Sequence, residues 1–285
     1  MADPIGARHH SMQRLRRLSR RRSARSDEAA FVIDGPTLLA EALDAGVRID
    51  EVVAEPGCPQ ALLDRAAAAG AVVHRTGDGE LARVVDAVTP QRVAAVARLA
   101  DRPPSEAAGA AGPLALVLVG VSDPGNAGTL LRSAEAAGGG AVLFCDGSVD
   151  PFGPKCVRSS AGSVFRLAVT RQGSSGAALA ALAAAGLRRV ATRARGAPPY
   201  DAADLGGPVA LVLGNEAHGL PRAVVDAVDE VVSIPMAGRT ESLNVSMAGT
   251  VLCFEALRQR RSRRGGGPTN RLDETPPQAA GCTTT

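Results

Sequence analysis

Residues 114–133 read LALVLVGVSDPGNAGTLLRS, and this stretch combines a buried strand, a Gly-rich turn and the start of a helix. Leu114–Val119 is continuously apolar, which is typical of a strand covered on both faces in a parallel sheet. Pro124 and the glycines after it predict a break, and Thr129 is the expected N-cap of a helix that runs to Ala137. Open α/β folds bind ligands at the carboxyl ends of such strands. The polar side chains of this turn are therefore placed for chemistry.

The second half of the chain continues to alternate strands and helices, which predicts a doubly wound parallel sheet in an α/β domain spanning 114–264. We expect further strands at 141–145, 164–169, 188–192, 209–213 and 231–234, and helices at 154–161, 176–185, 221–228 and 244–263. The last helix is apolar on more than one side, so it cannot be a simple surface helix. Burial against another subunit would explain it.

A smaller α/β unit precedes this domain and is expected to span 13–100. Its predicted strands and helices alternate as well: helices at 12–25, 37–45, 59–69 and 80–86, and strands at 31–34, 51–54, 72–74 and 93–99. Residues 1–12 and the tail 265–285 are expected to be disordered. Residues 101–113 are rich in Pro, Gly and Ala without apolar periodicity, which predicts an interdomain linker.

Positive charge gathers at both ends of the chain. Residues 1–30 carry eight Arg against three acidic residues, a net +5, and residues 257–285 carry six Arg against two, a net +4. Because the whole chain is +3, the middle is about −6. Basic ends on an acidic middle favour a polyanionic partner, although solvated tails would carry the same charge. The run from Met12 to Arg25 predicts a helix whose basic side could face RNA phosphates.

Composition narrows the class of protein further. Aromatic residues make up 2% of the chain and Trp is absent, which argues against stacking of bare bases on several aromatic side chains. The five cysteines are widely separated, which predicts neither a zinc site nor a disulfide framework. No run approaches about 18 uninterrupted apolar residues. We expect a cytoplasmic protein with no metal and no membrane segment.

Three polar clusters follow strand ends: DPGNAGTLLRS at 123–133, LGNEAHGL at 213–220 and IPMAGRTESLNVS at 234–246. The first lacks the spacing of a phosphate-binding P-loop and the third glycine of the dinucleotide fingerprint. Taken alone, Asn126 fits an ordinary turn residue, and Glu216, Ser242 and Asn244 fit helix caps. Three such loops in one sheet nevertheless exceed what turn chemistry requires.

In this order, NAGTLLRS, LGNEAHGL, and IPM followed by SLNVS resemble the signature motifs of the SpoU/TrmH family of RNA 2′-O-ribose methyltransferases, within the SPOUT superfamily. The run RRLSRRRSARSDEAAFVIDGPTLLAEAL at 16–43 is similar to the basic helix, strand and turn of that family's N-terminal RNA-binding domain. Asp34 stands where many relatives have Glu, so the carboxylate is kept.

The resemblance implies a fold, a cofactor and a set of site residues. The fold would be a parallel-sheet domain with a trefoil knot that binds S-adenosylmethionine (AdoMet) and forms homodimers through the knotted region. The residues that would hold the cofactor are Thr192, Leu213, Gly214, Asn215, Glu216, Ile234, Met236 and Leu243. The catalytic residues would be Asn126, Arg132, Glu216, Ser242 and Asn244.

Arg132 is the family's proposed activator of the ribose hydroxyl. Because a guanidinium has a pKa above about 12, we expect Arg132 to stabilise developing alkoxide charge, and to act as a base only in a strongly perturbing site. Glu216 could orient it. Lys155 and Arg158 could contact RNA phosphates, or simply begin a solvated helix.

The two-domain layout favours 23S rRNA as the substrate over tRNA, although the basic termini also fit a tRNA enzyme. A resistance methyltransferase of the thiostrepton type has a similar layout and stays open. A non-catalytic RNA-binding protein of the same fold is a further alternative, which the intact motifs disfavour. Methylation of a base is disfavoured by the first motif.

Overall fold

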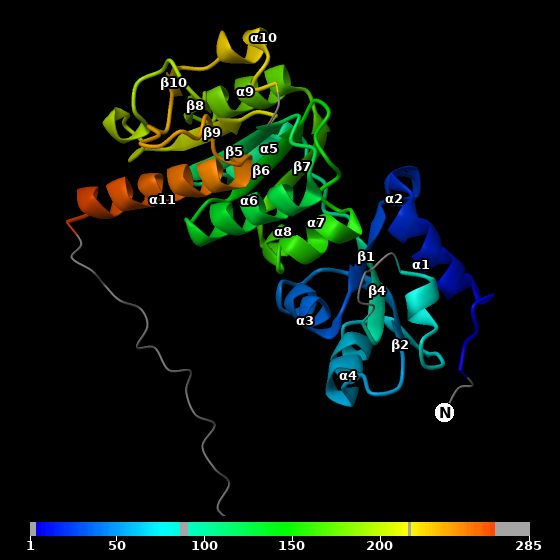
Figure 1. The fold of residues 1–285 in the computed structure, drawn as a ribbon. Coiled ribbons are helices and arrows are strands. Elements are labelled where there is room, and N and C mark those ends of the chain that lie inside the picture. The colour runs from blue at the N-terminus through cyan, green and yellow to red at the C-terminus, as the bar shows by residue number, and fades with distance from the viewer. Residues whose placement is uncertain (1–3, 86–90, 216–217, 266–285) are drawn as a thin grey trace, which may run out of the picture.

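The computed structural model describes residues 4–85, 91–215 and 218–265, which form two α/β units (Figure 1). The first unit has a four-stranded sheet in the order β1-β4-β2-β3. The pair β2 and β3 is parallel, whereas β4 is antiparallel to both of its neighbours. The strands are β1 (Ala30–Asp34), β2 (Ile49–Ala54), β3 (Val72–Arg75) and β4 (Val93–Arg98).

Helices cover both faces of this sheet, because its strands are apolar on both sides. On one face lie α1 (His10–Arg20) and α2 (Arg22–Glu28), with the short helix η1 (Leu81–Arg83); on the other lie α3 (Pro36–Asp44) and α4 (Gln60–Ala68). The expectation of disorder up to residue 12 is wrong for its described part. The Ile5 N–H donates to the Arg75 carbonyl at 2.7 Å, and Met12 is fully buried.

The second unit contains a six-stranded sheet in the order β10-β8-β9-β5-β6-β7, and every neighbouring pair is parallel. This confirms the predicted parallel sheet. Its strands are β5 (Leu114–Val119), β6 (Ala141–Cys145), β7 (Ala168–Gly173), β8 (Arg188–Thr192), β9 (Val209–Leu213) and β10 (Glu230–Val232).

The strand expected at 164–169 begins too early. Residues 164–166 belong to a short helix, α8 (Ser163–Arg166), and only 168 and 169 belong to β7, which begins at Ala168. Gly162 precedes the helix with φ +91°, a conformation that turns the chain where a continuous strand was expected. A short apolar run does not distinguish a strand from a buried helical turn.

Residues of β5 alternate between two buried layers. Leu114, Leu116 and Leu118 belong to one cluster of buried side chains, and the intervening Ala115, Val117 and Val119 to another. The first layer includes α6 (Pro124–Ala136), α7 (Pro154–Ser159), α8 and α11 (Val245–Arg263), and also η2 (Tyr200–Ala202). The second includes α5 (Pro104–Ala110), α9 (Ser175–Ala184) and α10 (Arg222–Val225).

The stretch expected to be a linker contains α5. Ala107, Ala108 and Ala111 are buried against the second layer, so small side chains that lack an obvious periodic stripe still pack as a helix. No helix in the described part of the chain is long and apolar enough to cross a membrane.

Candidate active site

The first strand-end loop passes into α6 earlier than expected. Pro124 is the first residue of the helix, where its missing N–H costs nothing. Asp123 is the N-cap, and its Oδ1 accepts the backbone N–H of Asn126 at 2.8 Å. That hydrogen bond helps to lower the pKa of Asp123. Thr129, the expected cap, lies inside the helix and donates to the Gly125 carbonyl. Asn126 is therefore held in the first helical turn.

The first and third loops meet through their asparagines. Nδ2 of Asn244 donates to Oδ1 of Asn126 at 3.0 Å, while Oδ1 of Asn244 accepts the backbone N–H of Ser246 at 2.9 Å. Asn244 is thus the N-cap of α11, as its residue type also suggested. The Ser246 hydroxyl lies 3.3 Å from Asn126 Oδ1 and 2.6 Å from Asn244 Oδ1. Sequence reasoning missed Ser246, although it stands two residues after Asn244 in the third motif.

The second loop forms a narrow turn after β9. Backbone hydrogen bonds join Asn215 and Gly219 in both directions, at 3.2 and 2.9 Å. Nδ2 of Asn215 donates to the Gly120 carbonyl at 2.8 Å, which ties this loop to the end of β5. A Cβ at Gly214 would lie 2.6 Å from the carbonyl carbon of Gly219, so no other residue fits there. Glu216, expected to be both catalytic and cofactor-binding, lies outside the described residues.

A cavity of about 360 Å³ opens beside the second and third loops. Its size lies within the range of about 300–1,000 Å³ that is typical of small-molecule sites. Apolar side chains from β10 and α11 form one part of its wall and the glycines of the second loop another. It is lined by most of the expected cofactor residues, namely Thr192, Gly214, Asn215, Ile234, Met236 and Leu243, and by Ser242. Leu213 is fully buried and does not line it.

The other expected catalytic residues lie outside the cavity wall. Asn126 and Asn244 form the pair described above, and Arg132 is exposed on α6. Among the described residues, Arg132 makes no ion pair or side-chain hydrogen bond. Next to it, the Ser133 hydroxyl contacts that of Thr250 at 2.7 Å, which joins α6 to α11. The site therefore combines a partly apolar cavity with the polar Asn126–Asn244 pair beside it, and Arg132 is a further exposed cation on α6.

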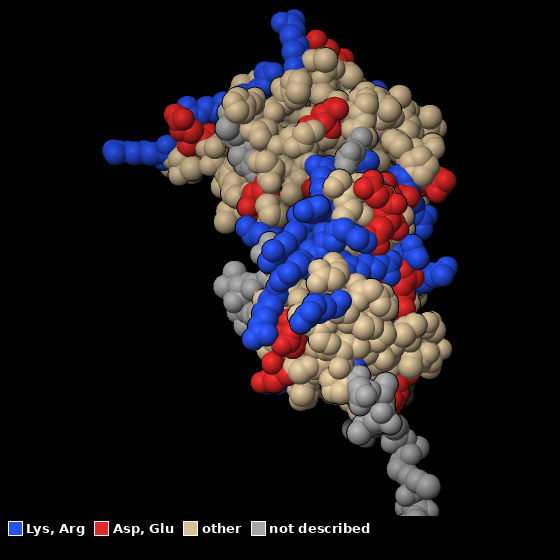
Figure 2. Space-filling view, turned by 90° about the vertical axis from the view of Figure 1, so that its right-hand side faces the viewer, with Lys and Arg blue, Asp and Glu red and all other residues tan. Residues whose placement is uncertain are grey.

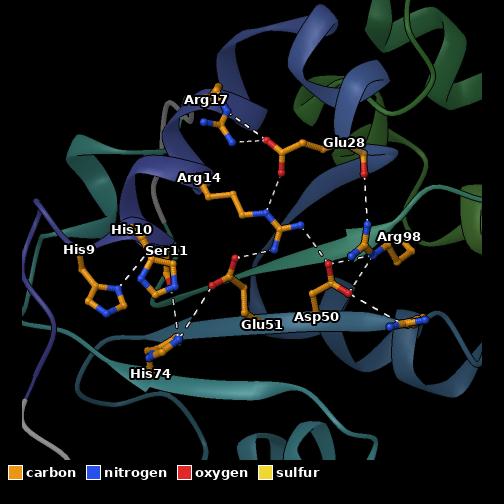
Figure 3. A network of polar contacts seen from close by, with 11 residues as sticks. His9, His10, Ser11, Arg14, Arg17, Glu28, Asp50, Glu51, His74 and Arg98 are labelled. Carbon is orange, nitrogen blue, oxygen red and sulfur yellow. Dashed lines mark hydrogen bonds and ion pairs between the residues drawn. The ribbon is translucent and has the colours of Figure 1, made fainter.

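Arginines of the first unit serve as internal ion-pair partners or as exposed surface charge, and Arg17 does both. Arg14 binds Glu28, Asp50 and Glu51 at 2.8–3.0 Å and fastens α1 to α2 and the sheet (Figure 3). Although burial opposes it, Arg14 and Arg17 hold the pKa of Glu28 below its ordinary value.

Figure 2 shows Arg and Lys side chains in a band across one face of the molecule. The exposed basic residues of α1 and α2 are Arg16, Arg17, Arg20 and Arg22, with Arg21 between the helices.

A parallel sheet whose strand-end loops border one cavity defines the chain as a ligand-binding α/β protein of the doubly wound class. Residues 113–254 match the SpoU rRNA Methylase family, and residues 10–95 match the MRM3-like substrate binding domain. The chain is 32% identical to the 23S rRNA (guanosine(2553)-2′-O)-methyltransferase RlmP of Bacillus subtilis (strain 168), over 81% of its own length and 89% of the relative's. The chain therefore belongs to the SpoU rRNA methylase family.

Solved structures agree with this assignment. An AdoMet-bound rRNA methyltransferase from Sinorhizobium meliloti has a TM-score of 0.81 and 29% identity, over 90% of this chain and 97% of that one. A structure titled RNA 2′-O ribose methyltransferase has a TM-score of 0.74 and 33% identity, over 90% and 98%. The family resemblance of the sequence motifs is thus confirmed, and the similarity extends over both units.

Proposed function

We propose that this chain transfers the methyl group of AdoMet to a ribose 2′-hydroxyl of ribosomal RNA, with 23S rRNA as the substrate. The observation that carries the proposal is the cavity beside the second and third loops, whose lining residues Leu243 and Val245 flank Asn244 of the Asn126–Asn244 pair. The similarity to RlmP along nearly the whole relative supports the choice of 23S rRNA. We assign substrate binding to residues 13–100 and catalysis to 114–264.

The cavity suits AdoMet because its glycine-rich side lets backbone groups approach a ligand closely. At Gly214 even a Cβ would collide with the opposite side of the turn. The apolar wall from β10 and α11 suits an adenine ring. When bound, AdoMet supplies an electrophilic methyl group on a sulfonium. Thr192, Gly214–Glu216, Ile234, Met236 and Leu243 would hold it.

The chain's own residues would position and activate the hydroxyl. Arg132 donates hydrogen bonds to the RNA phosphate and to the 2′-oxygen, and so stabilises the alkoxide charge that develops as the hydroxyl proton passes to water. The 2′-oxygen takes the methyl group, and S-adenosylhomocysteine leaves with the electron pair of the broken C–S bond. Glu216 orients Arg132. Asn126, Ser242 and Asn244 hold the loops and the ribose, so that the hydroxyl lies in line with the transferred group.

Two features of assembly belong to the same proposal. We infer a trefoil knot in the catalytic unit, supported by the sheet order, in which β9 lies between β5 and β8, and by the family. We also infer a homodimer through α11. Met247 and Phe254, seven residues apart on this helix, are 61% and 46% exposed. Large apolar side chains at such spacing are typical of an interface.

We further propose that the basic residues of α1 and α2 contact RNA phosphates and that the enzyme acts in the cytoplasm. The test is incubation with labelled AdoMet and an unmodified 23S rRNA transcript, followed by alkaline hydrolysis. A methyl on the 2′-oxygen blocks cleavage, so the label should appear in alkali-resistant dinucleotides. Label in mononucleotides would indicate methylation of a base and contradict the proposal.

A further inference from the structure

A short segment, residues 150–159, lies between the two units and contacts both. It consists of the end of the loop after β6 and the helix α7, which lies beside β1 of the first unit (Figure 1). Each side of this segment is fixed by charged or hydroxyl side chains rather than by apolar packing alone. Its contacts therefore specify one arrangement of the units.

On the side of the first unit, two ion pairs hold the segment. Arg25 of α2 donates from Nε to Oδ2 of Asp150 at 2.8 Å, and both side chains are buried. Arg158 of α7 donates from Nη1 to Oδ2 of Asp34 at 3.0 Å. The Asp34 side chain, at the end of β1, is only 2% exposed. Burial raises the pKa of Asp34, and Arg158 opposes this rise.

On the side of the catalytic unit, the same helix contacts the first turn of α6. The hydroxyl of Ser159, which follows Arg158, donates to the Pro124 carbonyl at 2.9 Å. A Cβ at Gly128 would lie 1.9 Å from that hydroxyl oxygen, so only glycine at this position allows α6 and α7 to pack this closely. Lys155 forms an ion pair of 3.6 Å with Asp123. Asp123 is the N-cap of α6 and accepts the backbone N–H of Asn126.

We propose that Arg158 is a positioning residue: its ion pair with Asp34 sets where α7, and with it the turn of α6 carrying Asn126, lies relative to the substrate-binding unit. This inference rests on the proposed function. Ribosomal RNA held by the first unit must present its hydroxyl to residues of the second. A misplacement of about 1 Å can cost on the order of 100-fold in rate. Arg158, which could have contacted RNA phosphates or simply begun a solvated helix, forms an ion pair with Asp34 of the other unit.

The test uses neutral variants of the full chain, Asp34→Asn and Arg158→Gln, singly and together. We expect each single variant to lower kcat on the 23S rRNA transcript by about 10-fold or more. The double variant should lose little beyond either single one, because both remove the same contact. The affinity for AdoMet should be unchanged, and Arg158→Lys should recover part of kcat. The control is Arg65→Gln, whose ion pair with Asp44 joins α3 and α4 within one unit.

A second measurement separates this proposal from the proposed function. Hydrogen exchange in residues 121–131 should be faster in Asp34→Asn than in the wild type, and unchanged in Arg65→Gln. If the wild type shows no methyl transfer, the proposed function is wrong. The hydrogen-exchange comparison still tests whether the ion pair between Arg158 and Asp34 positions the turn of α6. Unchanged exchange, an unchanged kcat despite a lower melting temperature, or additive losses in the double variant would each overturn the proposal.

Discussion

The side-chain amide of Asn244 donates a 3.0 Å hydrogen bond to Oδ1 of Asn126, which joins two strand-end loops 118 residues apart in the sequence. The same Asn244 caps α11 through its own Oδ1. One side chain thus stabilises a helix and orients a residue expected to be catalytic. The two roles use different atoms and can be separated by mutation.

Asn244→Asp should keep the cap and lose the donor. An Asp carboxylate still accepts the Ser246 N–H, and its charge suits a helix N-terminus, but it cannot donate to Asn126. We expect a melting temperature close to that of the wild type and a loss of methyl transfer of at least 10-fold. Asn244→Ala should lose activity and also about 0.5–2 kcal/mol of stability. Wild-type activity in Asn244→Asp would show that the Asn126 contact is dispensable.

Gly214→Ala should abolish the cofactor cavity without unfolding the chain. The new Cβ would lie 2.6 Å from the Gly219 carbonyl carbon, so the second loop must open. We expect AdoMet affinity to fall at least 10-fold by calorimetry. Gly176→Ala in α9 is the matched control, because its Cβ would meet only the Ser174 hydroxyl at 3.6 Å. Equal effects of the two variants would count against the assignment of the cavity.

Phe254→Glu should convert the proposed dimer to a monomer. The substitution places a charge in an apolar interface, where it has no partner and loses its hydration. Light scattering after size exclusion would report the mass. Val72→Glu is the control, since Val72 is 57% exposed but lies on β3, far from α11 in the fold. A monomeric wild type, or a Phe254→Glu dimer, would refute the interface.

Asp150→Ala should strongly destabilise the protein. It leaves the guanidinium of Arg25, whose side chain is 6% exposed, without its carboxylate. Breaking a buried ion pair in this way typically costs about 3–5 kcal/mol. Asp226→Ala removes an exposed pair with Arg222, for which about 0–1 kcal/mol is typical. Urea unfolding of both variants would measure the difference, and similar losses would contradict the buried role of Arg25.

Four strands of the catalytic sheet could be predicted from sequence because each is a short run enriched in β-branched or apolar residues, with a glycine or proline close to at least one of its ends. Residues 114–119, 141–145, 188–192 and 209–213 form strands with the expected limits. The start of α6 was misplaced because Pro124 was interpreted only as a helix breaker, whereas Asp123 caps the helix and proline fits its first position. The helix α5 was missed because its alanines are buried by tertiary packing, which has no local signal.

The sequence predicts which residues belong to the candidate site but not how those residues contact one another. Motif resemblance named Asn126 and Asn244, and their hydrogen bond appears only when α6 and α11 pack together. Arg158 was expected to contact RNA phosphates or solvent, and it contacts Asp34 across the two units. Such long-range pairings depend on topology, and spacing along the chain does not contain them.

Methylation of 23S rRNA is tested by comparing three unmodified RNAs, 23S rRNA, 16S rRNA and tRNA, as acceptors of label from AdoMet. Wild-type protein and Arg132→Ala would be assayed side by side, with AdoMet binding measured for both. We predict 2′-O-methyl label in 23S rRNA alone, abolished in Arg132→Ala while AdoMet binding is kept. Label only in tRNA or 16S rRNA, or no label in any RNA despite intact AdoMet binding, would contradict the account.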